Sequence, residues 1–222
     1  MLVQNWMTTD VVSVGPDATM LKIGKLLKER NIRRVPVVDE GNRVLGIISD
    51  RDVKAASPSK ATSLDMHEIN YLLAKVTAKD IMTKDPVTIG PTDTIEKAAM
   101  LMLDHRCGSL PVIEESRRMV GIITDHDVFK AMVDTTCVRQ GGFQLGLRVP
   151  DTAGAMQPVF DVLRSRGARI LSVASINEND ATRKVFIRLR SMNTREEEDA
   201  LVEAVREKAR MLYWVRNTTH MD

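Results

Sequence analysis

The hydrophobic and polar positions of residues 1–135 follow one pattern that occurs twice. Short β-branched runs predict strands, and apolar residues at helical spacing predict helices. In the first copy the predicted order is strand, helix, strand, strand and helix, over residues 11–14, 20–28, 35–38, 44–48 and 49–56. The second copy follows at one constant offset, so Met7 returns as Met82 and Gly46 as Gly121. The duplication predicts two similar β-α-β-β-α modules about a pseudo-two-fold axis, with two equivalent clefts.

Local residues refine this pattern. Thr19 or Asp17 precedes the first helix as its N-cap. Strand 44–48 is apolar enough to predict burial on both faces. Pro36 has no backbone N–H to donate, so it predicts the start or the edge of its strand.

The segments around the two copies set the predicted domain boundaries. A polar loop after the first copy leads into a short linker helix, with Ser63 or Asp65 as its cap and Leu73 near its end. The predicted ranges are 1–60 for the first repeat, 61–75 for the linker helix, 76–135 for the second repeat, 136–142 for a linker, and 143–217 for a C-terminal domain.

The C-terminal domain has a different order of elements. Alternating apolar residues predict a strand over 143–149, and a helical stripe from Met156 to Leu163 is closed by Gly167. The remaining predicted elements are strands 170–176 and 185–189, a helix 195–210 capped by Asn193 or Thr194, and a strand 212–215. The order β-α-β-β-α-β is the ferredoxin-like arrangement. The predicted fold class is therefore α/β for the repeats and α+β for the C-terminal domain.

The composition is that of an ordinary globular protein. Of 222 residues, 43% are apolar and 28% are charged, and the formal net charge is +2. This balance favours neither a nucleic acid nor an anionic membrane as partner. No apolar run reaches the roughly 18 residues of a membrane helix, and no signal peptide is visible, so we expect a cytoplasmic location. Cys107 and Cys137 are expected to be free thiols, with Cys107 as a small core residue.

The sharpest local motif is Gly46-x-x-Ser49-x-x-Asp52, which returns as Gly121-x-x-Thr124-x-x-Asp127. Each copy lies where a strand turns into a helix, and the free N–H groups there stabilise a phosphate. A hydroxyl can donate to a phosphate or ribose oxygen, and a carboxylate can accept from ribose hydroxyls. The same residues also fit an acidic capping box that satisfies only its own backbone. From the residues alone, both interpretations remain open.

The two repeats resemble a tandem pair of CBS domains, the regulatory modules named after cystathionine β-synthase. The resemblance rests on Met7-Thr8 and Met82-Thr83, on Arg34-Val35-Pro36-Val37 and Leu110-Pro111-Val112, and on both Gly-x-x-[Ser/Thr]-x-x-Asp motifs. It covers residues 1–135. It implies two clefts that take AMP, ADP, ATP or another adenosyl ligand, with Ser49 and Asp52 in one cleft and Thr124 and Asp127 in the other.

Further positions follow from the same comparison of the two copies. Arg51 and His126 occupy one repeat position inside the motif, where they either face a phosphate or lie in solvent. Arg33 and Arg34 match Gly108 and Ser109, so the two clefts should differ in charge. The resemblance also implies that Ser13 and Thr88, on the first strand of each repeat, contact the base, whereas ordinary strand positions explain them equally well.

The C-terminal domain resembles an ACT domain, a small amino-acid-sensing module. The matching residues are Leu147-Arg148-Val149-Pro150-Asp151-Thr152-Ala153-Gly154, although the usual proline of this turn is absent. Asp151 and Gly154 are the candidate ligand turn; as alternatives, Asp151 caps the following helix and Gly154 serves only a tight turn. A CBS pair followed by an ACT module is similar to the domain order of bacterial acetoin-utilisation accessory proteins.

No catalytic or metal-binding constellation is visible in the sequence. The four histidines are scattered, and neither a P-loop nor a nucleophile elbow occurs. We therefore expect a protein that is not an enzyme and holds no cofactor or metal. The expected function is a homodimeric or higher oligomeric sensor of adenosyl ligands that acts on an unidentified metabolic enzyme. The alternative is a scaffold whose clefts hold no ligand.

Overall fold

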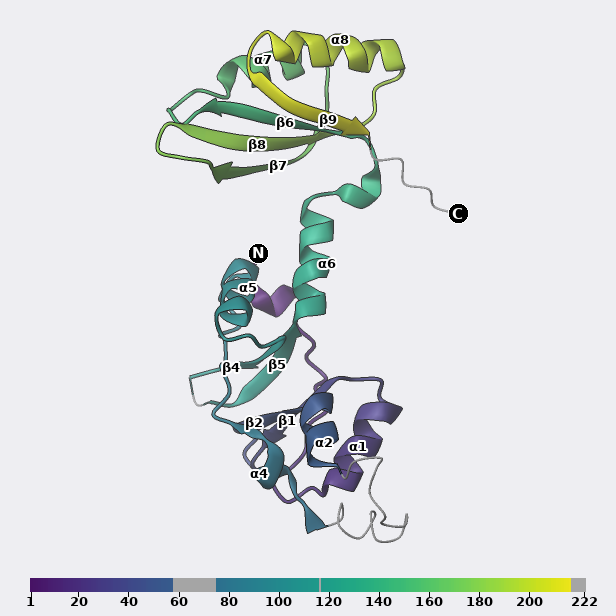
Figure 1. Ribbon diagram of the computed structural model, residues 1–222, viewed down its shortest axis with the longest axis vertical. Coiled ribbons are helices and arrows are strands. Elements are labelled where there is room, and N and C mark those ends of the chain that lie inside the picture. Colours follow the sequence, from purple (N-terminus) through teal and green to yellow (C-terminus); the bar gives the residue numbers. More distant parts are fainter. Residues whose placement is uncertain (58–74, 116, 217–222) are drawn as a thin grey trace. The chain divides into compact units, whose positions relative to one another are not determined.

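The computed structural model describes residues 1–57, 75–115 and 117–216. The chain divides into an N-terminal unit, Met1–Phe129, and a C-terminal unit, Lys130–Asp222. Figure 1 shows the elements of both units. Most of the linker helix predicted over residues 61–75 lies outside the described residues.

The N-terminal unit contains both sequence repeats, and each repeat places one helix before and one after an antiparallel strand pair. The first repeat consists of η1 (Val3–Asn5), α1 (Met20–Glu29), β1 (Arg34–Val38), β2 (Val44–Ser49) and α2 (Asp50–Ala56). The second repeat consists of α4 (Ala78–Ile81), β3 (Thr83–Lys84), α5 (Ile95–Asp104), β4 (Ser109–Ile113), β5 (Met119–Thr124) and the first turns of α6 (Asp125–Thr135).

The first helix of each repeat begins at a threonine cap. The Thr19 hydroxyl accepts from Lys22 N ahead of α1, which confirms Thr19 as the predicted cap, and Thr94 does the same for α5. Ile23 lies on the buried face of α1 and packs into a core with the apolar residues of β1 and β2. Local caps and apolar spacing thus fix these helices.

The two repeats exchange their first segments. Thr8 bridges Ile122 of β5, and β3, which contains Thr83, pairs with Gly46 and Ile47 of β2. The sheets therefore have the orders β1-β2-β3 and β4-β5, and each strand pair is extended by a segment from the other repeat. This exchange joins the repeats into one unit and was not predicted from the sequence.

The motif glycines make this exchange possible. A Cβ atom on Gly46 would lie 2.5 Å from Met82 Sδ and 2.9 Å from the Thr83 carbonyl oxygen. Gly121 has the same relation to Met7, with the Thr8 carbonyl at 3.0 Å. Only glycine leaves room for the crossing backbone, so the repeated Gly and the repeated Met-Thr are one structural device.

Two predictions about the strands were wrong. Residues 11–14 form no regular strand: only Val14 bridges Val37, because Val11 and Val12 line a cavity instead. Strand β2 is not buried on both faces, since burial alternates along it and Ile47 borders a second cavity. Pro36 lies inside β1, which is an edge strand of its sheet as expected.

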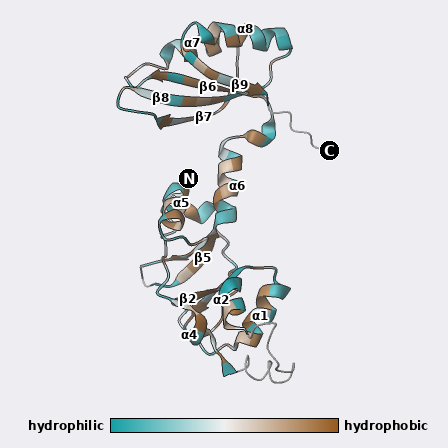
Figure 2. Ribbon diagram, viewed as in Figure 1, coloured by the Kyte–Doolittle hydropathy of each residue, from teal (hydrophilic) through white to brown (hydrophobic). Residues whose placement is uncertain are grey.

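The C-terminal unit is an antiparallel sheet packed against two helices. Its elements are β6 (Phe143–Pro150), α7 (Gln157–Ser165), β7 (Ile170–Asn177), β8 (Thr182–Leu189), α8 (Arg195–Arg206) and β9 (Arg210–Arg216), preceded by η2 (Val138–Gln140). The strand order is β7-β8-β6-β9, and the element order is the one the sequence pattern predicts. Brown, apolar stretches run along β6 and β8 in Figure 2.

The ends of these helices follow local signals with one exception. Thr194 caps α8, and Gly167 follows α7 with φ +66°, both as predicted. Helix α8 ends at Arg206, four residues earlier than expected, because β9 already begins at Arg210. One face of the sheet and both helices enclose the core.

A charged cluster joins β6, β8 and the turn that follows β7. Glu178 binds Arg148 at 2.6 Å, and Lys184 lies 3.0 Å away. The Arg148 hydrogen bonds, followed by that of Lys184, lower the pKa of Glu178 to about 2. The Glu178 carboxylate therefore contributes stability above its ordinary pKa, near 4.5, and loses this contribution as the pH falls towards 2.

We expect Gly46→Ala to lower the free energy of unfolding by about 1–3 kcal/mol, because the new methyl group meets the backbone of the crossing segment. Chemical denaturation measures the change. Gly15→Ala is the control, since open space surrounds its Cβ position. Equal effects of the two substitutions would contradict the proposed role of Gly46.

We expect Glu178→Gln to lower the melting temperature at pH 7, with the difference from the parent shrinking as the pH falls from about 4.5 to about 2. Thermal unfolding followed by circular dichroism over this range is the measurement. Glu203→Gln, which removes an exposed pair with Arg206, is the control. A difference that stays constant down to pH 2 would contradict the assigned pKa.

Candidate functional site

Two cavities of similar size lie in the N-terminal unit. We name them after the hydroxyl residue of the motif that each contains: the Thr124 cleft, about 770 Å³, and the Ser49 cleft, about 710 Å³. Both volumes fall in the range of roughly 300–1,000 Å³ that is usual for small-molecule sites.

Each cleft takes its walls from both repeats. The Thr124 cleft is lined by Thr8, Asp10, Val11, Val12, Asn31, Ile32, Arg33, Arg34, Pro36, Ile122, Thr124, Asp125, His126, Asp127 and Phe129. The Ser49 cleft is lined by Arg33, Arg34, Ile47, Ser49, Asp50, Arg51, Asp52, Thr83, Asp85, Pro86, Val87, His105, Arg106, Cys107, Gly108, Ser109 and Asp125. One wall comes from the first segment of a repeat, and the opposite wall from the last strand and helix of the other.

The clefts are related residue by residue through the duplication. Asp10 of one cleft corresponds to Asp85 of the other, and Asn31 corresponds to Arg106. The exchange of first segments produces this relation, because it sets each Met-Thr segment beside the other repeat's motif. The structure thus brings the motif residues of the two repeats into two separate, equivalent clefts.

The motif hydroxyls and carboxylates form capping boxes. Ser49 N and Ser49 Oγ both donate to Asp52 Oδ2 at 2.7 Å, and Asp52 N donates back to Ser49 Oγ at 3.3 Å. Thr124 and Asp127 repeat this arrangement at 2.8, 2.7 and 3.4 Å. The hydrogen bonds that the capping interpretation requires are therefore present in both clefts.

Capping leaves part of each motif open for a ligand. In the described part of the chain, Oδ1 of Asp52 and Oδ1 of Asp127 accept no hydrogen bond. Both carboxylates are half-buried and line their clefts. Each can accept from a ribose hydroxyl through its free oxygen while its other oxygen holds the helix start. A role in ligand binding stays a prediction.

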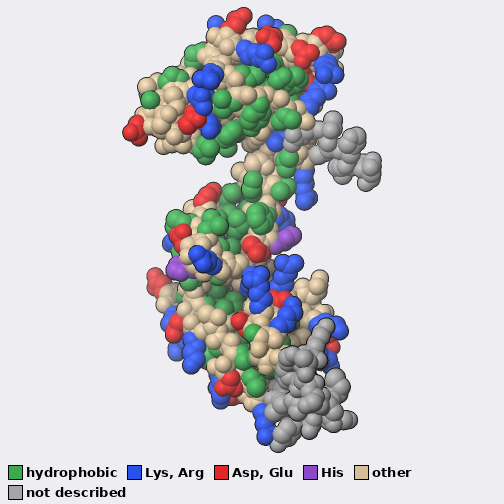
Figure 3. All heavy atoms as spheres, viewed as in Figure 1, with side chains coloured by type: hydrophobic (Ala, Val, Ile, Leu, Met, Phe, Trp, Pro, Cys, Tyr) green, Lys and Arg blue, Asp and Glu red, His purple; other side chains and the backbone are tan. Residues whose placement is uncertain are grey.

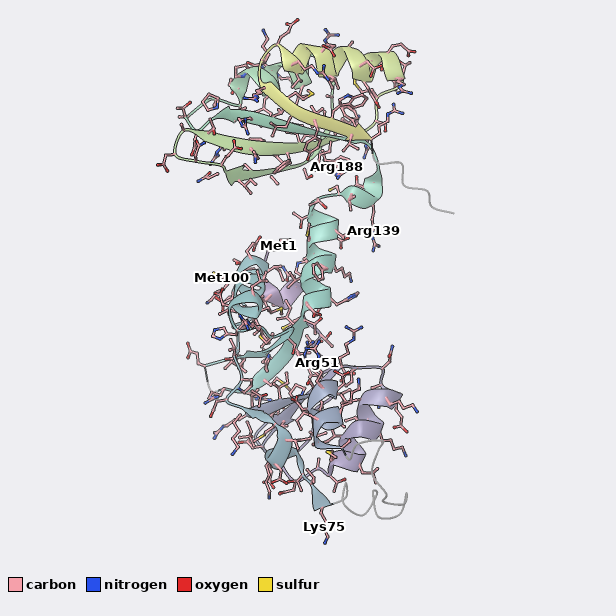
Figure 4. All side chains as sticks on the ribbon, viewed as in Figure 1. Met1, Arg51, Lys75, Met100, Arg139 and Arg188 are labelled. Atoms are coloured by element: carbon pink, nitrogen blue, oxygen red, sulfur yellow. The ribbon has the colours of Figure 1, made fainter. Side chains whose placement is uncertain are left out.

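The other candidate binding residues are distributed over the two clefts. Arg51 lies exposed at the start of α2 in the Ser49 cleft (Figure 4), and His126 is exposed in the Thr124 cleft. Arg34 is half-buried and lines both clefts, and its Nη1 donates to the Gly108 carbonyl at 2.9 Å. Figure 3 shows Lys and Arg side chains gathered on the N-terminal unit in the area of α2.

Ser13 and Thr88 lie apart from these groups. Both are half-buried, and each precedes a residue that bridges to its own repeat's sheet, Val14 or Ile89. The described residues that line the two clefts include neither. Their predicted contact with a base therefore has no support from the cleft geometry.

Several cleft residues were missed by the sequence analysis. Asp10, Asp85, Arg106 and Asp125 line the clefts, and Cys107 is a half-buried free thiol in the Ser49 cleft and not part of the core. The repeat offset was the available signal, because it pairs each position in one copy with an equivalent position in the other. The crossing of the repeats decides which of these positions line a cleft, and no local sequence pattern indicates that crossing.

The candidate ligand turn of the C-terminal unit is less enclosed. Asp151 lies 2.9 Å from Arg183 Nε, so it pairs with a cation and does not cap α7, whose N-cap is Met156. Gly154 has φ +78° and borders a shallow depression that includes Gln157 and Lys208. The turn therefore requires glycine for its backbone conformation, and a ligand role stays a prediction.

The described ranges contain no cluster of three or more His, Cys, Asp or Glu residues that could hold a metal ion. None of the helices in these ranges is both long enough and apolar enough to cross a membrane.

Comparison with known proteins identifies the N-terminal unit. The model of the CBS domain family matches residues 3–59 and 78–134, more than half of the chain. An inosine-5′-monophosphate dehydrogenase from Korarchaeum cryptofilum is 31% identical over 166 residues, which are 72% of this chain. The chain covers 32% of that enzyme, about one third of its length. The family match ends before β6, the first strand of the C-terminal sheet.

Solved structures give the same result. The CBS-pair protein CBSX2 in complex with AMP has 27% identity and a TM-score of 0.50, and the match covers 60% of this chain and 96% of that one. A protein from Vibrio cholerae named AcuB after acetoin utilization has 26% identity and a TM-score of 0.52, with coverage of 63% and 96%.

Proposed function

The chain belongs to the CBS domain family, and on this premise we propose that it is a non-catalytic regulatory sensor of adenosyl ligands. One ligand, AMP, ADP, ATP or a related compound, would occupy each cleft of the N-terminal unit. The observation that carries this proposal is the pair of equivalent cavities, each with a half-buried carboxylate that keeps one oxygen free. The AMP complex of the related CBSX2 supports the choice of ligand class.

The residues would act in three ways. Asp52 and Asp127 would accept from ribose hydroxyls, Ser49 and Thr124 would orient these carboxylates, and the arginines of the clefts would bind phosphate oxygens. A ligand shifts the protein between two states only by binding one of them more tightly. The two walls of a cleft come from different repeats. A bound ligand would therefore contact both repeats and favour the state of the protein in which it makes both sets of contacts.

A scaffold without ligands is the second candidate, and the capping boxes favour it. Each motif hydroxyl donates one hydrogen bond and accepts one within the chain, and each Oδ2 accepts two. The two functions differ in one observable, since any ligand of the folded state raises the melting temperature.

For the C-terminal unit we propose a dimerisation role, as the resemblance to ACT domains implies, together with amino-acid sensing at the turn that contains Gly154. Strand β7 is an edge strand with Val173 47% and Ile176 55% exposed. Apolar edge strands pair with another chain unless they are protected. The acetoin-utilisation context, which the likeness to AcuB supports, and the regulation of a metabolic enzyme are likewise proposals.

We expect calorimetry with adenosyl ligands, AMP and ATP among them, to find two sites, with Asp52→Ala and Asp127→Ala each weakening one site about tenfold or more, because a buried ribose hydroxyl then loses its acceptor. NAD and S-adenosylmethionine belong in the same screen. Asp80→Ala is the matched control: Thr77 N and Thr77 Oγ1 donate to Asp80 Oδ2 at 2.8 and 2.6 Å, but this capping box lines neither cleft.

The three variants separate capping from binding. Unchanged affinity in Asp52→Ala and Asp127→Ala would show that the residue assignment is wrong. A melting temperature that does not move in millimolar ligand would favour the scaffold.

We expect the chain to be a dimer, and Ile176→Lys to shift it towards the monomer, because a charge on the exposed edge opposes pairing. Analytical ultracentrifugation measures the shift. Leu103→Lys, at an apolar position of α5 that is 78% exposed, is the control. Dissociation by Leu103→Lys alone would place the interface on the N-terminal unit instead.

A further inference from the structure

The two clefts share one set of charges and differ in the rest. Arg33, Arg34 and Asp125 line both clefts, so their charges do not distinguish one cleft from the other. Of the residues that line only one cleft, those of the Ser49 cleft include Arg51 and Arg106, whereas those of the Thr124 cleft include no arginine.

The carboxylates widen this difference. In the Ser49 cleft, Asp50 pairs with Lys54 at 2.9 Å and Asp85 pairs with Arg117 at 3.1 Å, and neither cation lines the cleft. The Lys54 hydrogen bond lowers the pKa of Asp50, which keeps that ion pair charged. Among the residues that only this cleft contains, two arginines therefore stand against one unpaired carboxylate, Asp52.

The Thr124 cleft has the opposite balance. Within the described residues, Asp10 and Asp127 form no ion pair, and the position that matches Arg51 holds His126. The position that matches Arg106 holds Asn31. This cleft therefore opposes added negative charge, whereas the Ser49 cleft attracts it.

A second observation in the Ser49 cleft points to a ligand oxygen. Ser109 is 4% exposed and borders the cleft, yet its Oγ has no hydrogen-bond partner in the described part of the chain. A buried hydroxyl without a partner is costly. A phosphate oxygen or a ligand hydroxyl would supply the missing partner.

The shared arginine is anchored across the pseudo-two-fold axis. Gly108 has no side chain, and the Arg34 guanidinium of the other repeat and the Asp125 carboxylate fill the space where its Cβ atom would lie. Arg34 Nη1 is held there by the Gly108 carbonyl, while Ser109, the repeat counterpart of Arg34, is too short to return the contact. Arg34 is thus fixed where it lines both clefts, and the difference between the clefts rests on the residues that they do not share.

We propose that the Ser49 cleft selects phosphorylated adenosine, whereas the Thr124 cleft takes an uncharged or cationic adenosyl compound. This inference rests on the proposed function, because it assigns ligand classes to the same two clefts. The selectivity resides in the pairs Arg51/His126 and Arg106/Asn31, which occupy equivalent positions.

A reciprocal exchange tests the assignment. Arg51→His with Arg106→Asn gives the Ser49 cleft the residues of the other cleft, and His126→Arg with Asn31→Arg makes the reverse change. Asn31 and Arg106 both have positive φ, at 50° and 51°. The exchange of these two residues therefore requires no change of backbone conformation at either position. Calorimetry with adenosine, AMP, ATP and S-adenosylmethionine provides the measurement, and Arg30→Gln, an exposed position outside both clefts, is the control.

We expect the first exchange to weaken AMP and ATP about tenfold or more with adenosine unchanged, and the reverse exchange to strengthen phosphate binding in the Thr124 cleft. The Asp52→Ala variant should lose the site that prefers AMP over adenosine. If Asp127→Ala loses that site instead, or if AMP and adenosine bind the Ser49 cleft equally, the inference is overturned and the proposed function stands. If no adenosyl compound binds the parent chain, both are overturned.

Discussion

The close approach of each Met-Thr segment to the motif glycine of the other repeat is the contact on which the N-terminal unit depends. It lets β3 extend the sheet of the first repeat and lets Thr8 bridge β5 of the second. The same crossing gives each cleft its second wall, since Thr8 lines the Thr124 cleft and Thr83 lines the Ser49 cleft. The glycine is therefore conserved between the copies for a steric reason, although it lies in a motif whose other residues face a cavity.

The duplication makes the two clefts equivalent in backbone but not in charge. A repeat fixes which positions line a cleft, since the exchange of segments acts on both copies alike. The side chains at these positions are then free to diverge, as Arg33 and Arg34 have from Gly108 and Ser109. The absence of a side chain at Gly108 leaves room for the Arg34 guanidinium of the other repeat. Because Arg34 lines both clefts, the residue at position 108 influences the charge of both.

Local signals in the sequence predicted the local structure. Thr19, Thr194 and Gly167 define helix ends through contacts within four residues, and they were identified correctly. The strand predicted over residues 11–14 was wrong, because β-branched residues fit a cleft wall as well as a strand. The alternative that Asp151 caps α7 is wrong, because its carboxylate pairs with Arg183 of β8 instead. The partners that decide such positions are distant in the sequence, so no local pattern shows them.

The capping boxes show why a motif alone does not identify a site. Thr77 N and Oγ1 donate to Asp80 Oδ2 just as Thr124 N and Oγ1 donate to Asp127 Oδ2, so a hydroxyl and a carboxylate three residues apart make these two bonds at both places. Only the second pair faces a cavity with a wall from the other repeat. A carboxylate oxygen that is free beside solvent exchanges water, whereas one that is half-buried in a cleft meets fewer waters and binds a ligand hydroxyl at a smaller desolvation cost. The function of the motif therefore follows from the wall opposite to it, which the exchange of segments supplies.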